Sequence, residues 1–419
     1  MMSENKKLVP KRRFREFRNS DDWEQCKLSE MTYLITKGTT PIDKSGKGNI
    51  NFVKIENIDS SSGEISISSK ISEEEHNGYL KRSQLQENDI LFSIAGTLGR
   101  VTLVNKRVLP ANTNQALAII RLKTGYLNYI KTYLKGRAVA DFIKKNPTIG
   151  AQPNLSLEQV GNLDIDLPSY NEQQEIGTFF TQLDNLITLH QRKLEKMKAL
   201  KTAYLSEMFP AEGERKPKRR FKGFENAWEQ RKLKQLANFT KGQGYSKSDL
   251  TDAGTPVILY GRLYTKYQSI ISEVDTFVVP KIGSVYSTGK EVIVPASGET
   301  AEDIARASAV VKSGILLGGD LNIIYPNKNI STIFLALSIS NGQQQKELAK
   351  KAQGKSVVHL HNGDLEGVTI TYPCKEEQEK IESVFSNIDN LITLHQRNLE
   401  KLQNIKNAYL NEMFVGGEQ

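Results

Sequence analysis

At 419 residues this chain is too long for one hydrophobic core, so we expect two or more domains. Its hydrophobic content of 38% and charged content of 25% are those of an ordinary globular protein. No run approaches the ~18 apolar residues of a membrane span, and the charged N-terminus lacks a signal-peptide core, so a cytoplasmic protein is expected. The net charge of +9 suits a polyanionic partner, while the distant Cys26 and Cys374 argue against a zinc module or a disulfide framework.

The first half of the chain begins with a basic segment, residues 1–21, followed by a predicted domain at 22–170. In this domain the apolar runs are short, rich in β-branched residues and bounded by Gly, Pro and Asn, which predicts strands. Residues 126–145 have the pattern of a helix. A much longer helix is predicted at 171–209, which contains no proline and only one glycine, Gly177.

The second half has the same order of predicted elements. A basic, proline-containing connector at 210–226 leads to a second domain at 227–373. Within that domain a helix is predicted at 332–352, with Gly354 as its C-cap. A second long helix is predicted at 374–414. Each domain therefore reads as an α/β (α+β) globular unit followed by one long helix.

A tandem duplication explains this order. The sequence DNLITLHQR occurs at 184–192 and again at 389–397, an offset of 205 residues. Each half also opens alike, because Pro10-Lys-Arg-Arg-Phe14 recurs from Pro217 and Trp23-Glu-Gln25 recurs from Trp228. Between these matches the halves share apolar runs but little identity. The chain is thus a repeat of one framework with two different surfaces.

The two long helices carry the same apolar seam. Steps of four and three alternate along each helix, which is the pattern of a coiled coil. A helix of this length needs a partner for its stripe, and the nearest candidate is its own duplicate. The core helices of two separate bundles are the alternative. The predicted seam positions are Leu183, Ile187, His190, Leu194 and Met197 in the first helix and Ile388, Ile392, His395, Leu399 and Leu402 in the second.

This organisation resembles the specificity subunits of type I restriction–modification systems over essentially the whole chain. The most specific elements are the two DNLITLHQR helices, each preceded by a proline and a Glu/Gln-rich start, and the Trp-Glu-Gln sequence that opens each half. The resemblance implies two target-recognition domains, at about 22–170 and 227–373, each reading one part of a two-part DNA site. It implies that the paired helices set the gap and hold the modification subunits. Pseudo-two-fold symmetry of two direct repeats requires these helices to run antiparallel, as in an antiparallel coiled coil.

Candidate DNA contacts follow from the positions at which the two halves differ. Asn and Arg make bidentate contacts to adenine and guanine in the major groove, whereas lysines are better suited to phosphates. Ordinary solvated loop residues are the alternative for many of these positions. The candidates are Lys54, Asn57, Arg100, Asn112, Asn114 and Gln115 in the first domain, and Tyr260, Arg262, Tyr264, Lys266, Tyr267 and Lys290 in the second.

We expect no catalytic site in this chain. The sequence has no complete P-loop and no glycine-rich S-adenosylmethionine loop after a strand, and His359 and His361 form a pair without a third metal ligand. By the resemblance, S-adenosylmethionine, ATP and magnesium belong to partner subunits. The expected partners are double-stranded DNA, two modification subunits and two restriction subunits, with no membrane. A stand-alone two-domain DNA-binding regulator is the alternative function.

Overall fold

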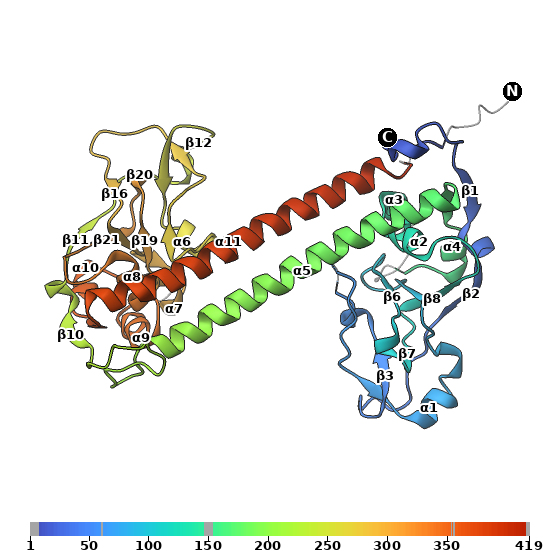
Figure 1. Ribbon diagram of the computed structural model, residues 1–419, viewed down its shortest axis with the longest axis horizontal. Helices are drawn as coiled ribbons and strands as arrows, with labels where there is room; N and C mark the ends of the chain where they lie inside the picture. The colour runs from blue at the N-terminus through green and yellow to red at the C-terminus, as the bar shows by residue number, and fades with distance from the viewer. Residues whose placement is uncertain (1–7, 60–61, 146–153, 353, 355–356, 416–419) are drawn as a thin grey trace. The chain divides into compact units, whose positions relative to one another are not determined.

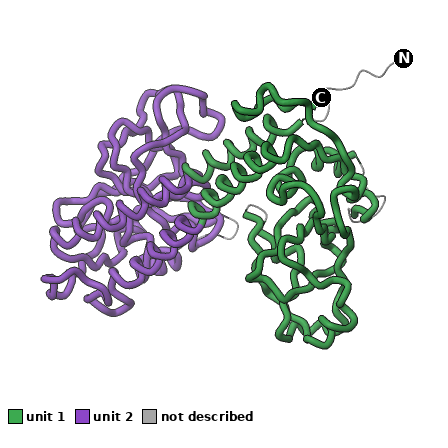
Figure 2. The backbone as a smooth tube through the Cα atoms, turned by 45° about the vertical axis from the view of Figure 1, so that its right-hand side comes forward, with its two compact units in different colours: residues 1–191, 397–419 green, residues 192–396 purple. Residues whose placement is uncertain are grey.

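The computed structural model describes residues 8–59, 62–145, 154–352, 354 and 357–415. The chain divides into two compact units, residues 1–191 with 397–419 (unit 1) and residues 192–396 (unit 2) (Figure 2). Both divisions fall at equivalent places in the repeated helices, after Gln191 and after Gln396. Each unit therefore contains one globular domain, the beginning of its own long helix and the end of the other.

The globular part of unit 1 is built on a four-stranded sheet in the order β2-β8-β5-β6 and a three-stranded sheet in the order β4-β3-β7. A third, two-stranded sheet pairs β1 with β9 antiparallel, so that Glu24 lies opposite Leu167. The strands of unit 1 are β1 Glu24–Lys27, β2 Thr32–Lys37, β3 Ile50–Val53, β4 Lys70–Ile71, β5 Ile90–Ser93, β6 Val101–Leu103, β7 Ala111–Thr113, β8 Leu117–Leu122 and β9 Asp164–Leu167. Its helices are α1 Glu73–Asn77, α2 Leu127–Leu134, α3 Arg137–Lys145, α4 Leu157–Gly161 and the start of α5 Tyr170–Met208.

Unit 2 repeats this framework with larger sheets, in the orders β11-β21-β17-β19-β14 and β12-β15-β13-β20-β16. Its strands are β10 Glu229–Lys232, β11 Ala237–Lys241, β12 Leu250–Thr251, β13 Thr255–Ile258, β14 Ile270–Ile271, β15 Phe277–Val278, β16 Tyr286–Thr288, β17 Glu291–Pro295, β18 Ser297–Gly298, β19 Ser308–Val310, β20 Ser313–Leu317, β21 Leu321–Pro326, β22 Val358–His359 and β23 Thr369–Tyr372. Its helices are α6 Arg262–Thr265, α7 Ala301–Ile304, α8 Thr332–Ile339, α9 Gly342–Lys351, α10 Asn362–Glu366 and the start of α11 Lys375–Glu412.

The long helices α5 and α11 confirm the two predicted helices and are drawn in green and red in Figure 1. The shorter helices differ from the prediction. Residues 126–145 form α2 and α3, and residues 332–352 form α8 and α9, instead of one helix each. The first break falls at Gly136, and the second precedes Gly342, whose φ of +59° does not continue a right-handed helix. The helix ends at Lys351 and not at the expected cap, Gly354. No helix among the described residues is long and apolar enough to cross a membrane.

In unit 1, the last part of α11 packs against the beginning of α5. Lys406 Nζ lies 2.6 Å from Asp184 Oδ1, and the rings of Tyr409 and Phe179 are 5.1 Å apart. Residue numbers rise along one helix as they fall along the other, so the two segments run antiparallel. The end of α11 then supplies Met413 and Phe414 to the core of the first domain, where they join Trp23 and Tyr129.

In unit 2, the last part of α5 packs in the same way against the beginning of α11. Lys201 Nζ lies 2.5 Å from Asp389 Oδ1, and Phe209 packs against Trp228 and Phe385 in the core. With the offset of 205 residues, each of these contacts is the counterpart of one in unit 1. The two helices therefore pair in the same register in both units. Each domain core is completed by a Met-Phe pair from the end of a long helix.

The basic segment before each domain binds the beginning of the long helix that follows that domain. Arg13 binds Glu172 through two hydrogen bonds of 2.8 and 2.6 Å, and its counterpart Arg220 binds Glu377 through two of 2.8 Å. The side chains of both glutamates are almost fully buried, and hydrogen bonding to these carboxylates raises the pKa of both arginines. Removing one partner of such a buried pair leaves an uncompensated charge, which costs about 3–5 kcal/mol. These segments therefore stabilise the packing of the long helices on their domains.

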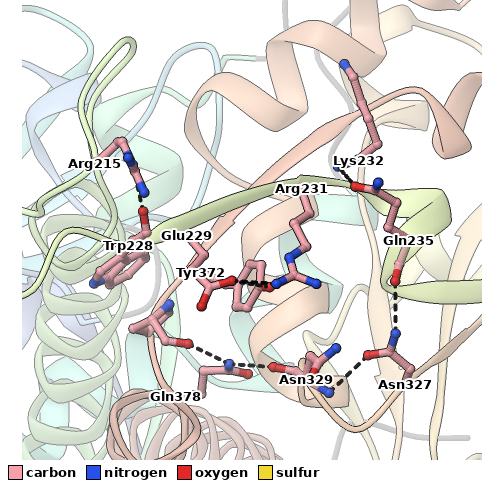
Figure 3. Close-up of polar contacts among 11 residues, drawn as sticks. Arg215, Trp228, Glu229, Arg231, Lys232, Gln235, Asn327, Asn329, Tyr372 and Gln378 are labelled. Atoms are coloured by element: carbon pink, nitrogen blue, oxygen red, sulfur yellow. Dashed lines mark hydrogen bonds and ion pairs between the residues drawn. The ribbon is translucent and has the colours of Figure 1, made fainter.

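Figure 3 shows how polar contacts hold the start of the second domain. The Arg215 guanidinium donates to the Trp228 carbonyl at 2.7 Å, and Tyr372 of β23 donates to Glu229 of β10 at 3.1 Å. Near the start of α11, Gln378 donates to the carbonyl of Asn329 at 3.0 Å. These bonds join the connector, the edge pair β10–β23 and α11 into one corner of unit 2.

Candidate DNA-recognition surfaces

The predicted contacts of the first domain fall into buried and exposed groups. Asn112 is fully buried, and its amide nitrogen donates to the Leu80 carbonyl and to Ser83 Oγ at 2.8 and 3.0 Å. Asn57 is 5% exposed and donates to Ser68 Oγ at 2.7 Å. Both side chains form hydrogen bonds within the domain, so the structure gives them an internal role.

The other four candidates of the first domain reach the surface to different degrees. Arg100 is half-buried and donates to the carbonyls of Ile55 and Ile58 at 3.2 and 2.9 Å. The Asn114 side chain accepts from the Ala116 amide at 3.2 Å. Gln115 is exposed and bonded to Thr40. Lys54 is half-exposed, and its Nζ lies 3.9 Å from Glu56 Oε1. Lys54 and Gln115 remain the best-exposed polar groups.

In the second domain, Arg262 is locked by neighbours. Its guanidinium donates to Asp275 at 2.6 Å and to Gln268 at 3.1 Å, and its side chain is 10% exposed. Lys266 also pairs with Asp275, and the two cations, Lys266 first, lower the pKa of Asp275 to about 2. Lys266 and Lys290 are exposed.

Two of the three predicted tyrosines pack against one cation, and the third packs against one of those two. Tyr264 donates to the Ser297 carbonyl at 2.7 Å, and Tyr267 donates to the Ala307 carbonyl at 3.1 Å. The Arg306 guanidinium lies over both of these rings, 5.8 and 5.3 Å from their centroids. Tyr260 packs edge-on against Tyr264 and keeps 39% of its surface exposed. The hydroxyls of Tyr264 and Tyr267 are thus used internally, and Tyr260 presents a ring to solvent.

The predicted seam of the long helices is buried to different extents. Leu183, Ile187, Leu194 and Ile388 are buried, whereas Met197, Ile392, Leu399 and Leu402 are half-buried. His190 and His395 are also half-buried. On other faces of the repeated segment, the leucines at equivalent positions stay exposed, namely Leu186, Leu189, Leu391 and Leu394. The structure therefore leaves the same apolar stripe open on both copies of the helix.

Among the described residues, no group of three or more His, Cys, Asp or Glu side chains is placed to hold a metal ion. The rings of His359 and His361 stack with centroids 6.4 Å apart, and His359 Nδ1 lies 3.2 Å from Ser297 Oγ. This pair lies on and beside β22, which pairs with β18.

A framework repeated twice, with polar surfaces that differ and helices that match, defines a protein with two recognition modules. The family described as type I restriction modification DNA specificity domain matches this chain twice, at residues 20–199 and 225–404. The chain belongs to this family.

Relatives match this chain over nearly its whole length or over about half of it. The type I restriction enzyme MjaVIII specificity subunit of Methanocaldococcus jannaschii is 22% identical over 94% of this chain and 93% of its own length. The type I restriction enzyme EcoBI specificity subunit of Escherichia coli is 26% identical over 46% of this chain and 42% of its own. A crystal structure of the type I restriction–modification S subunit from M. genitalium shares the fold with a TM-score of 0.69, 14% identity and coverage of 98% of this chain and all of that one. Since these relatives are subunits of restriction enzymes, a stand-alone regulator is disfavoured.

Proposed function

We propose that this chain is the DNA-reading subunit of a type I restriction–modification complex, and that each domain reads one half of a bipartite site. The observation that carries this proposal is that the two long helices pair in the same register in both units. Asp184 pairs with Lys406, and Asp389 pairs with Lys201 in the same way. The exposed side chains of the two domains, by contrast, differ. Helix contacts that match between the two halves, together with surfaces that differ, are what a constant spacing and a variable target require. The chain itself is non-catalytic and acts on DNA in the cytoplasm.

The partners follow from the same arrangement. Two copies of one exposed leucine stripe, Leu186 with Leu189 and Leu391 with Leu394, suit two copies of one partner, the modification subunit. Two restriction subunits complete the complex. S-adenosylmethionine, ATP and magnesium are held by those partners. A specificity subunit should copurify with modification subunits in a one-to-two ratio, whereas a regulator would be isolated alone.

Independent reading of two half-sites is tested by paired substitutions. Gln115→Ala should relax one half of the methylated sequence, and Tyr260→Ala should relax the other half, because each residue is exposed on a different domain. A good base contact is worth ~1–3 kcal/mol of discrimination. Sequencing of methylated DNA from the reconstituted complex measures the outcome. Relaxation of both halves by either single change would contradict the assignment.

The spacer between the half-sites tests the role of the helices. Seven residues inserted after Gln191 and seven after Gln396 keep the apolar seam in phase and lengthen each helix by ~10 Å. At ~3.4 Å per base pair, the spacer of the methylated site should grow by about three base pairs. The half-site sequences should not change. An unchanged spacer would show that the helices do not set the distance.

A further inference from the structure

A cluster of lysines lies where α2 meets the long helices in unit 1. The Asp184 carboxylate faces Lys406 at 2.6 Å and Lys131 at 3.6 Å, and all three side chains are largely buried. A third lysine, Lys135, follows α2 directly. Its Nζ lies 3.2 Å from the point that a Cβ on Gly63 would occupy, so it packs against Gly63. Three ammonium groups therefore share a region in which Asp184 forms ion pairs with Lys406 and Lys131.

The side-chain ammonium of Lys135 has no ion-pair or hydrogen-bond partner in the described part of the chain. The charges that act on it are Asp184 from α5, Lys131 from α2, Lys406 from α11 and the more weakly felt Asp59. The Asp59 carboxylate accepts hydrogen bonds from the backbone and hydroxyl of Ser62, at 2.7 and 2.8 Å. Burial, the largest effect, lowers the pKa of Lys135 to about 8 and also lowers that of Lys131. Holding a cation away from water without a counterion is unfavourable.

Unit 2 shows that pairing of the two long helices does not require the additional lysines Lys131 and Lys135. There Asp389 binds the single lysine Lys201, which also donates to Ser269 at 2.6 Å. The positions that correspond to Lys131 and Lys135 at the offset of 205 residues are Ala336 and Ser340. The two additional lysines therefore belong to the first domain alone, as its recognition surface does.

The cluster also contacts a part of the first domain that is close in sequence to a predicted DNA contact. Gly63, which Lys135 contacts, lies nine residues after Lys54 in the sequence. Arg100 holds the segment between them through the carbonyls of Ile55 and Ile58, and Thr102 bonds the Gly63 carbonyl. An anion that neutralises the cluster would therefore lie beside the loop that carries Lys54. Lysine is a strong point-charge partner for phosphate.

We propose that Lys131, Lys135 and Lys406 form a binding site for one backbone phosphate of DNA next to the half-site read by the first domain. The inference rests on the proposed function and adds an asymmetry to it: the first domain has a phosphate site that the second domain lacks. One of its ligands, Lys406, comes from the far end of the chain. The site fixes register and affinity and carries no base specificity.

Lys135→Gln, made in the full chain and assembled with modification subunits, tests the site. The log–log dependence of DNA affinity on salt should become shallower by about 0.9, the contribution of one phosphate. Between 50 and 200 mM salt, the loss of affinity should therefore shrink by about 3.5-fold. The methylated sequence should not change. Lys135→Arg should keep the wild-type slope, and Lys198→Gln, on the exposed surface of α5, should also leave it unchanged.

Thermal unfolding of the free chain distinguishes binding from a structural role. Because Lys135→Gln removes a half-buried cation whose ammonium has no ion-pair partner among the described residues, the variant should be at least as stable as the wild type while it binds DNA less tightly. An unchanged salt slope would overturn the proposal. The proposal would also be overturned if Lys135→Gln weakened binding of the modification subunit and left DNA affinity unchanged. The lysines would then bind a carboxylate of that subunit. A wild-type complex that does not bind DNA would instead refute the proposed function itself.

Discussion

Phe414→Ala should lower the free energy of unfolding of unit 1 by about 3–5 kcal/mol, the range for truncating a buried phenylalanine. Phe414 is 5% exposed, and its ring lies 5.6 to 5.8 Å from those of Tyr129, Tyr133 and Phe180. These partners come from α2 and α5, so the residue completes a core formed more than two hundred residues earlier in the chain. Alanine would leave a cavity that three large rings cannot fill without losing their packing.

The two tryptophans allow each unit to be followed alone. Trp23 lies in unit 1 and Trp228 in unit 2, and the chain contains no others. In a Trp228→Phe background, Phe414→Ala should shift the urea transition reported by Trp23. In a Trp23→Phe background, Phe209→Ala should shift the transition reported by Trp228. Leu186→Ala, at an exposed helix position, should stay within about 0.5 kcal/mol of its parent. Equal stability of Phe414→Ala and its parent would show that the chain end does not close the first core.

The repeat and the long helices could be predicted because their evidence lies in the local sequence. The seam of α5 and α11 is a regular spacing of apolar residues, and the offset of 205 is visible by direct comparison. The break between α2 and α3 escaped prediction, because the apolar spacing continues across Gly136. Gly177 shows a further limit. A Cβ there would lie 2.7 Å from the Tyr129 backbone, a close approach of two helices that no local pattern reveals.

Base-contacting residues are harder to predict, because the hydrogen-bonding groups of a side chain do not reveal where that side chain points in the fold. Asn112 and Asn57 have the chemistry of a base contact, yet both bond within the domain. The lysine cluster escaped prediction because α2, α5 and α11 bring its members together from distant parts of the sequence. One signal was available: Asp184 and Lys406 recur as Asp389 and Lys201, while Lys131 and Lys135 have no charged counterparts.

A fragment of residues 1–215 should form a symmetric dimer. In the whole chain, residues 397–414 close unit 1, and in the fragment the equivalent residues are 192–209. The residues that make the main contacts are the same in the two segments. Lys201 stands for Lys406 opposite Asp184, and Phe209 stands for Phe414. A second copy of the fragment can therefore supply to each domain what the end of α11 supplies in the whole chain, and exchange of the same surface in both directions is an isologous interface.

With modification subunits added, such a dimer should methylate a palindrome made of the first half-site and its inverted repeat. Its spacer should stay close to that of the parent site, because both helices keep their length. Light scattering measures the mass of the fragment, and sequencing of methylated DNA measures its target. The control is the fragment with Lys201→Glu and Phe209→Ala, which opposes like charges at Asp184 and empties the aromatic site, and which should be monomeric. A monomeric unmodified fragment would contradict the equivalence of the helices. A dimer that methylates a non-palindromic site would contradict the assignment of one half-site to each domain, because two identical domains related by a two-fold axis can read only identical half-sites in opposite directions.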